Sequence, residues 1–147
     1  MATYMQGAIK QGSNPSEYGT DVGYSTFTRQ VTLQAPAATT GAFNVDAIIP
    51  VPVGSQIVSI TADSTVAWTA SGTVTLTAGI TAGGTEYITS VDLKTVTRSA
   101  PTLSAAQLAA MNNVGSNTSV VVRSAVAAAS GNYVGTTLVT VLYAPKL

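Results

Sequence analysis

Apolar and polar residues alternate along most of this chain, with the period of two that is typical of a β-strand with one buried face. The longest alternating region runs from Phe43 to Leu93. Inside it, Pro50 and Pro52 each remove a backbone hydrogen-bond donor, and Gly54 follows shortly after them. Because proline cannot continue a central strand, we expect a corner at residues 50–54 rather than a binding site.

The alternation predicts about eight strands joined by short connections. They are expected at residues 26–34, 43–49, 55–62, 65–69, 72–80, 87–93, 118–126 and 136–143. Asp63 and Ser64 are expected to form the turn between the third and fourth of these strands. Residues 81–84 end in two glycines, which favours a hairpin turn over a phosphate-binding loop.

One short helix is predicted at residues 104–111. Ser104 and Gln107 have the spacing of a capping box, and the alanine-rich segment that contains Gln107 has high helix propensity. A helix of about two turns is marginal by itself, so we expect it to pack on the sheet. Together these elements predict an all-β domain at residues 25–147, a β-sandwich or jelly roll of about eight strands with one short helix.

The alternation also assigns residues to the two faces of each strand. The expected core contains five apolar residues of neighbouring strands, namely Val58, Ile60, Val74, Leu76 and Ile80. Ile57 falls on the outward face of its strand. Trp68, the only tryptophan, is either a packing residue or a platform for a sugar ring, and we favour packing because no second exposed aromatic residue pairs with it. Ile57 and Trp68 are predicted to mark contacts with neighbouring chains.

Residues 1–24 show no sustained period and are rich in Gly, Ser, Asn and Tyr. They contain Tyr4, Tyr18 and Tyr24, half of the six tyrosines of the chain. One interpretation is a terminus without fixed structure that lies over the surface. The other is an extended arm that docks its aromatic rings on a partner, because tyrosine combines apolar area with a hydroxyl group. We expect residues 1–24 to form an N-terminal arm outside the sandwich domain.

Charged residues make up only 8% of the 147 residues, and six basic residues balance six acidic ones. A typical soluble domain has about 25% charged residues. Such a surface is a poor partner for nucleic acid, whose binding depends on phosphate neutralisation, and for an anionic membrane. Two explanations remain open, a monomer whose hydroxyl groups keep it soluble and a chain whose surface is largely buried in an assembly.

The sequence offers little catalytic chemistry. Histidine and cysteine are both absent, which removes the commonest general base and the thiolate ligands of metal sites. The six carboxylates are Glu17, Asp21, Asp46, Asp63, Glu86 and Asp92. No pair has a spacing that requires proximity, so a glycan-cleaving enzyme with two carboxylates is the least favoured alternative. We therefore expect no catalytic residue, no cofactor and no metal site.

The N-terminal residues lack the apolar core of a signal peptide, and no run of about 18 apolar residues is present. We expect neither a secretion signal nor a membrane span.

Several features together resemble the head decoration (cement) proteins of tailed bacteriophages and related small virion proteins. These features are an Ile-Pro-x-Pro-x-Gly segment that ends at Gly54, a Val-Ser-Ile strand, the segment GTVTLTAG that ends at Gly79, a Gly-Gly turn, and Val-Asp-Leu ending at Leu93. The C-terminal segment GNYVGTTLVTVLYAPKL is similar to the last strand of such jelly-roll folds. The resemblance covers roughly two thirds of the chain and consists of turn chemistry and alternation.

This resemblance implies a non-enzymatic structural protein that binds the outside of a phage capsid as an oligomer, commonly a homotrimer. Its partners would be the major capsid protein and further copies of itself, with no nucleic acid and no membrane. It would be made in the cytoplasm of the host bacterium and end up on the capsid surface of the virion. Two alternatives remain, a carbohydrate- or receptor-binding module of a fibre or tail, and a head–tail or other minor virion component.

Overall fold

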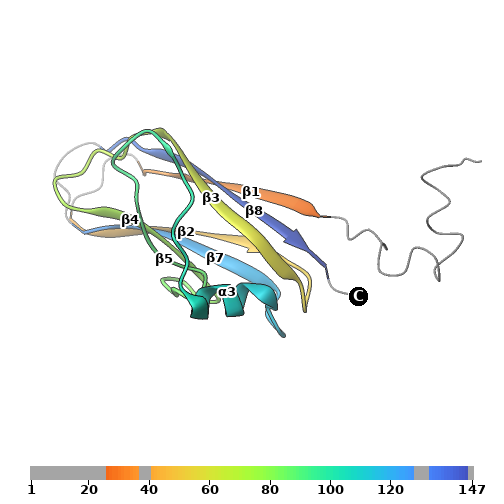
Figure 1. Ribbon diagram of the computed structural model, residues 1–147. Coiled ribbons are helices and arrows are strands. Elements are labelled where there is room, and N and C mark those ends of the chain that lie inside the picture. The colour runs from red at the N-terminus through yellow and green to blue at the C-terminus, as the bar shows by residue number, and fades with distance from the viewer. Residues whose placement is uncertain (1–25, 37–40, 128–132, 146–147) are drawn as a thin grey trace, which may run out of the picture.

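The computed structural model describes residues 26–36, 41–127 and 133–145. These residues form eight strands and one helix, arranged as two facing sheets with the helix beside one end (Figure 1). In chain order the elements are β1 (Phe27–Gln34), β2 (Phe43–Pro50), β3 (Gln56–Val66), β4 (Val74–Gly79), β5 (Ile88–Asp92), β6 (Arg98–Ser99), α3 (Ala105–Asn112), β7 (Ser119–Val126) and β8 (Thr136–Ala144).

The two sheets have the strand orders β1-β8-β3-β6 and β2-β7-β4-β5. Strand β1 pairs with β8, β2 with β7, β3 with β6 and β4 with β5, and every pair is antiparallel. The strands thus pair as in one long hairpin whose tip is formed by β4 and β5. This hairpin is folded over so that its strands are divided between two sheets. This nesting is the jelly roll, so the predicted fold class is confirmed.

The core lies between the sheets and consists mainly of β-branched residues. Strands β7 and β8 are central, and Val120, Val122, Val139 and Val141 are fully buried. Alternate residues of these strands face outward and are partly exposed. The predicted strands at 118–126 and 136–143 are therefore present, with one face in the core.

Strand β3 begins with a β-bulge that decides which of its residues face the core. Its register with β8 shifts between Ile57 and Ser59, which leaves Val58 as the extra residue. Ile57 is 2% exposed and Val58 is 48% exposed, so the predicted inward Val58 and outward Ile57 are wrong. The reason is that one inserted residue exchanges the two faces of a strand. After the bulge, Ile60 is buried as predicted.

Three further predictions fail where local pairing overrides the pattern. Asp63 and Ser64 do not form a turn, because they pair with β8 inside the long strand β3, which continues to Val66. The alternation predicts no strand at residues 94–102, but this segment contains the short strand β6, which pairs with β3. Ile80 is half exposed because β4 ends at Gly79 and the alternation stops there.

The predicted helix and hairpin are confirmed. Ser104 caps helix α3: its hydroxyl oxygen accepts from the Gln107 N–H at 3.2 Å, and the Ser104 N–H donates to Gln107 Oε1 at 2.9 Å. Strands β4 and β5 form the expected antiparallel pair, and Gly83 in the turn between them has φ +82°, which favours glycine.

Trp68 follows β3 and is held inside the core. It is 2% exposed, so the favoured interpretation as a packing residue is confirmed, and the outward position on which a contact with neighbouring chains depended is wrong. Its indole Nε1–H donates to Thr137 Oγ1 at 2.8 Å, and that oxygen lies 3.2 Å from Ser64 Oγ. A Cβ at Gly135 would lie 2.5 Å from the indole ring, so only glycine allows this approach. The tryptophan can be buried because the core itself supplies an acceptor for its N–H.

The substitution Thr137→Val keeps the shape of the side chain but removes the acceptor of the Trp68 N–H. We expect the free energy of unfolding to fall by about 1–3 kcal/mol, because a buried donor is left unsatisfied. Urea denaturation measures this change. Thr32→Val, at an exposed position of β1, is the control and should change stability by less than about 0.5 kcal/mol. Equal losses in the two variants would contradict the role of Thr137.

Candidate interaction surface

Several elements meet at one end of the sandwich, which we call the corner end. Strand β2 finishes there with Pro50 opposite Ser119, and β4 finishes there with Gly79 opposite Val121. The 50–54 corner, the start of β3 and helix α3 lie at the same end (Figure 1). The opposite end of the sandwich, where β3 finishes, is called the far end.

The corner itself is fixed by backbone hydrogen bonds to the segment after α3. The Gly54 N–H donates to the Gly115 carbonyl oxygen at 2.8 Å, and the Val114 N–H donates to the Ser55 carbonyl oxygen at 2.9 Å. Gly54 has φ +74°, a conformation that glycine adopts without strain. The predicted corner is confirmed, and it leaves the Val53 side chain exposed at its tip.

Helix α3 is tied to the β4–β5 hairpin through one buried amide. Gln107 Nε2 donates to Thr89 Oγ1 at 2.8 Å and to the Thr85 carbonyl oxygen at 3.2 Å. Met111, one turn later, is buried, whereas Leu108 is mostly exposed. The helix therefore buries one side and presents an apolar residue to the outside.

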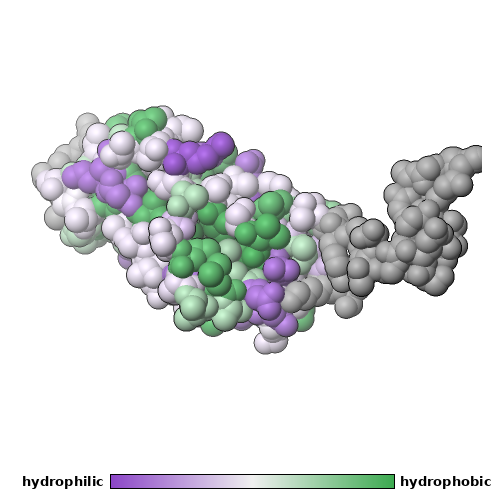
Figure 2. Space-filling model, in the orientation of Figure 1, coloured by the Kyte–Doolittle hydropathy of each residue, from purple (hydrophilic) through white to green (hydrophobic). Residues whose placement is uncertain are grey.

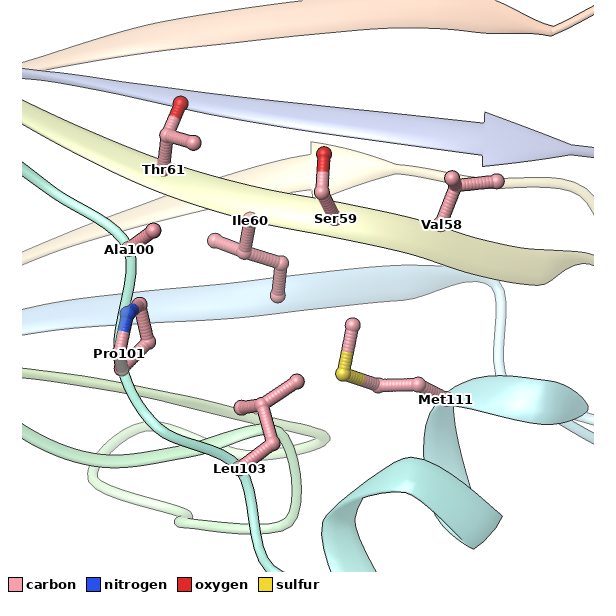
Figure 3. Close-up of a pocket in the computed structure, with 8 residues that line it drawn as sticks. All are labelled: Val58, Ser59, Ile60, Thr61, Ala100, Pro101, Leu103 and Met111. Atoms are coloured by element: carbon pink, nitrogen blue, oxygen red, sulfur yellow. The ribbon is translucent and has the colours of Figure 1, made fainter.

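A small apolar pocket of about 130 Å³ lies between β3 and the segment that leads into α3. Its lining residues are Val58, Ser59, Ile60, Thr61, Ala100, Pro101, Leu103 and Met111. Figure 3 shows the side chains of Ile60, Leu103 and Met111 pointing toward one another. No titratable residue lines this pocket, so it suits an apolar side chain and not acid–base chemistry.

Exposed large apolar residues gather at the corner end. Six of the nine described residues of this kind form what we call the corner-end patch: Phe27, Ile48, Val53, Val58, Ile80 and Leu108. The remaining three, Val66, Val96 and Val134, lie toward the far end. In Figure 2, hydrophobic surface covers part of the region that β3 and α3 occupy in Figure 1.

Phe27 lies at the corner end because its cross-strand neighbours lie there. It lies opposite Tyr143 of β8, and Tyr143 lies opposite Ile57 of β3. The rings of Phe27 and Tyr143 are stacked with their centroids 5.9 Å apart. Because Phe27 opens β1, residues 1–25 join the described part of the chain at the corner end.

Two arginine–aspartate pairs lie on the outer faces of the sheets. Arg123 donates to both carboxylate oxygens of Asp46 at 2.6 and 2.8 Å, and Arg98 does the same to Asp63 at 2.6 and 3.0 Å. These hydrogen bonds lower the pKa of Asp46 and of Asp63 below the ordinary value of an aspartate. Each pair neutralises itself, so neither contributes a free charge to the surface.

Three of the candidate carboxylates, Asp46, Asp63 and Glu86, are held in structural roles, and Glu17 and Asp21 lie outside the described residues. Asp46 and Asp63 are on different sheets and each is paired with its own arginine. Glu86 accepts a hydrogen bond from the Ile80 N–H at 3.1 Å in the hairpin turn. Within the described ranges no three acidic residues come together as a metal site. In that same part of the chain, no helix has the length and apolar character needed to cross a bilayer.

The residues predicted to form contacts fall into two groups. Tyr4, Tyr18 and Tyr24 lie outside the described residues. Ile57 and Trp68 are buried, so the outward face on which their predicted contacts depended is wrong. The sequence did contain a signal for an exposed apolar surface. Ile48 is an apolar residue at a position of β2 that alternation assigns to the outward face, and it is exposed.

The chain was compared with known families and proteins. No protein-family model matches it, and no curated protein matches it. Among solved structures, it is similar to a chain in the capsid asymmetric unit of cyanophage Pam1, with 21% sequence identity and a TM-score of 0.56. That similarity covers 87% of this chain and 90% of the other chain, and it shows a shared fold. A chain in the acid-stable capsid of Helicobacter pylori bacteriophage KHP30 is also similar, with 15% identity, a TM-score of 0.44, and coverage of 82% and 94%.

The ion pair between Asp46 and Arg123 makes stability depend on pH in a defined direction. Its carboxylate has a lower pKa in the folded state, so it stabilises the fold above the pKa of the unfolded chain, about 3.9, and this contribution is lost as pH falls further. We expect Asp46→Asn to reduce the loss of stability on acidification. Urea midpoints measured between about pH 2 and pH 6 test this.

Asp92→Asn is the matched control, since Asp92 forms no ion pair with any described residue. Its acid profile should stay close to that of the unmodified chain. If the two variants had identical profiles, the Asp46–Arg123 pair would not be the source of the pH dependence.

Proposed function

We propose that this protein is a structural component of a bacteriophage particle that binds the outer surface of the capsid as a homo-oligomer and reinforces the shell. The supporting observation is the likeness in fold to a chain of the cyanophage Pam1 capsid, which extends over nearly the whole of both chains.

The surface of the described domain supports an assembled role. Its two arginine–aspartate pairs are internally neutralised, and apolar side chains are concentrated at one end. Contiguous exposed apolar surface is typical of protein–protein contact sites. The low charge of the whole chain fits a protein partner better than nucleic acid.

The proposal assigns no catalytic activity. The candidate carboxylates Asp46, Asp63 and Glu86 already have structural hydrogen-bond partners. Trp68, the residue on which carbohydrate binding depended, is buried with its N–H bonded to Thr137. A decoration protein on the virion surface, with the major capsid protein and its own copies as partners, agrees best with these observations.

Particle composition tests this function. Assembled particles from cells that make this chain should be separated by density, and the copy number of the chain should be counted against the major capsid protein. We expect a constant ratio that matches the positions of the capsid lattice, and the purified chain should run as an oligomer, for example a trimer, in light scattering. A few copies per particle would indicate a vertex, head–tail or fibre component instead. Strictly monomeric protein that is absent from particles would refute the proposal.

Deletion of residues 1–24 tests the predicted N-terminal arm. We expect the shortened chain, residues 25–147, to fold, because the described strands begin at Phe27. Its co-sedimentation with capsid shells should be weaker than that of the full chain, because the arm would supply part of the contact area. Unchanged assembly and unchanged shell binding would show that the arm has no role in attachment.

A further inference from the structure

The corner-end patch is the strongest unassigned feature of the molecule, because six of the nine described exposed large apolar residues lie toward this end of the sandwich. Val53 and Val58 are exposed by the corner and by the β-bulge, and Leu108 is exposed on α3. The Arg98–Asp63 pair lies toward the far end, whereas the Arg123–Asp46 pair is beside the patch, next to Ile48 on the outer face of β2, and is neutralised within itself. Glu86 is near the patch, but its carboxylate accepts the hydrogen bond from Ile80.

We infer that the corner end is the surface by which the protein docks on the capsid shell, and that it fits an apolar surface of the shell protein. This inference rests on the proposed function and adds the face of the molecule that makes the contact. The patch is built from three strands, the corner, the turn that follows β4 and the helix, so its residues are held in place by the fold. The apolar pocket between β3 and α3 adjoins it through Val58 and can receive an apolar side chain.

The size of this end argues for a large partner and against a simple end-to-end dimer. At this end one sheet has four strands and the other three, since β6 pairs with β3 only at Ala62 and Asp63. Strands about 4.8 Å apart, in two sheets about 10 Å apart with their side chains, give an end of about 17 Å by about 20 Å, or about 350 Å². A stable interface buries about 800 Å² on each partner. Two copies that met only through this end would therefore bury about half the area they need.

The chain enters the described domain at this end. Residues 1–25 join β1 at Phe27, which lies in the corner-end patch. A partner that covers this end is therefore within reach of those 25 residues as well. A partner at the far end would be separated from them by the length of β1. The proposed function names two partners, the shell protein and further copies of this chain. Of these two, we infer that the shell protein covers the corner end, because a shell is wider than the end of one sandwich.

Two pairs of variants in the full-length chain test this surface. Val58→Asp and Val66→Asp introduce the same charge at opposite ends of β3, where the side chains are 48% and 44% exposed. Val53→Asp and Val96→Asp form a second pair, with 58% and 61% exposure. The assay is co-sedimentation with shells assembled from the major capsid protein alone, together with light scattering and far-UV circular dichroism.

We expect the corner-end variants, Val58→Asp and Val53→Asp, to bind shells about tenfold or more weakly, because a charge would be buried in an apolar contact. The far-end variants, Val66→Asp and Val96→Asp, should bind like the unmodified chain. If circular dichroism shows that Val58→Asp disturbs the bulge, Leu108→Gln provides the same test on helix α3, and it should also weaken binding.

Other results would overturn the inference in distinguishable ways. If all four variants bind like the unmodified chain, or if only the far-end variants weaken binding, the docking surface lies elsewhere while the proposed function stands. If the corner-end variants dissociate the oligomer but still bind shells, the patch joins copies of this chain instead. If the unmodified chain does not bind shells, the proposed function itself fails.

Discussion

The pairing of the last two strands with strands from the first half of the chain holds both sheets together. Strand β8 lies between β1 and β3, and β7 lies between β2 and β4, so neither sheet has a centre until the C-terminal segment is in place. Pairing partners such as Phe27 and Tyr143 are more than a hundred residues apart. Closing such long loops costs conformational entropy before contacts form, so we expect slow, cooperative folding.

This nested arrangement also explains where the interaction surface lies. The sheets cover one another along their inner faces, but the ends of the sandwich have no covering layer. At the far end, Trp68 is buried against Gly135 and closes the core. At the corner end, the chain turns at Gly54, and this turn leaves Val53 exposed. Helix α3 lies at the same end and leaves Leu108 exposed. The two ends therefore differ in character although the strands between them are alike.

The low charge of the chain has a structural counterpart. Asp46 and Arg123 are cross-strand neighbours on β2 and β7, and Asp63 and Arg98 are cross-strand neighbours on β3 and β6. Exposed pairs of this kind contribute little to stability, but opposite charges on facing strands favour the correct register over a shifted one. What remains of the surface is mainly hydroxyl, amide and apolar, which suits a protein that functions in an assembly.

The sequence by itself determined the elements whose signals are local. Alternation located every strand of the described residues except β6, although it placed a turn inside β3. The Pro50–Gly54 segment predicted the corner, and the capping box predicted the helix. Tertiary structure alone decided the faces of β3 and the place of Trp68. A bulge at Val58 depends on how β3 meets β8, and burial of Trp68 depends on an acceptor, Thr137, that lies 69 residues away. Such choices depend on partners distant in the chain, and local periodicity carries no information about them.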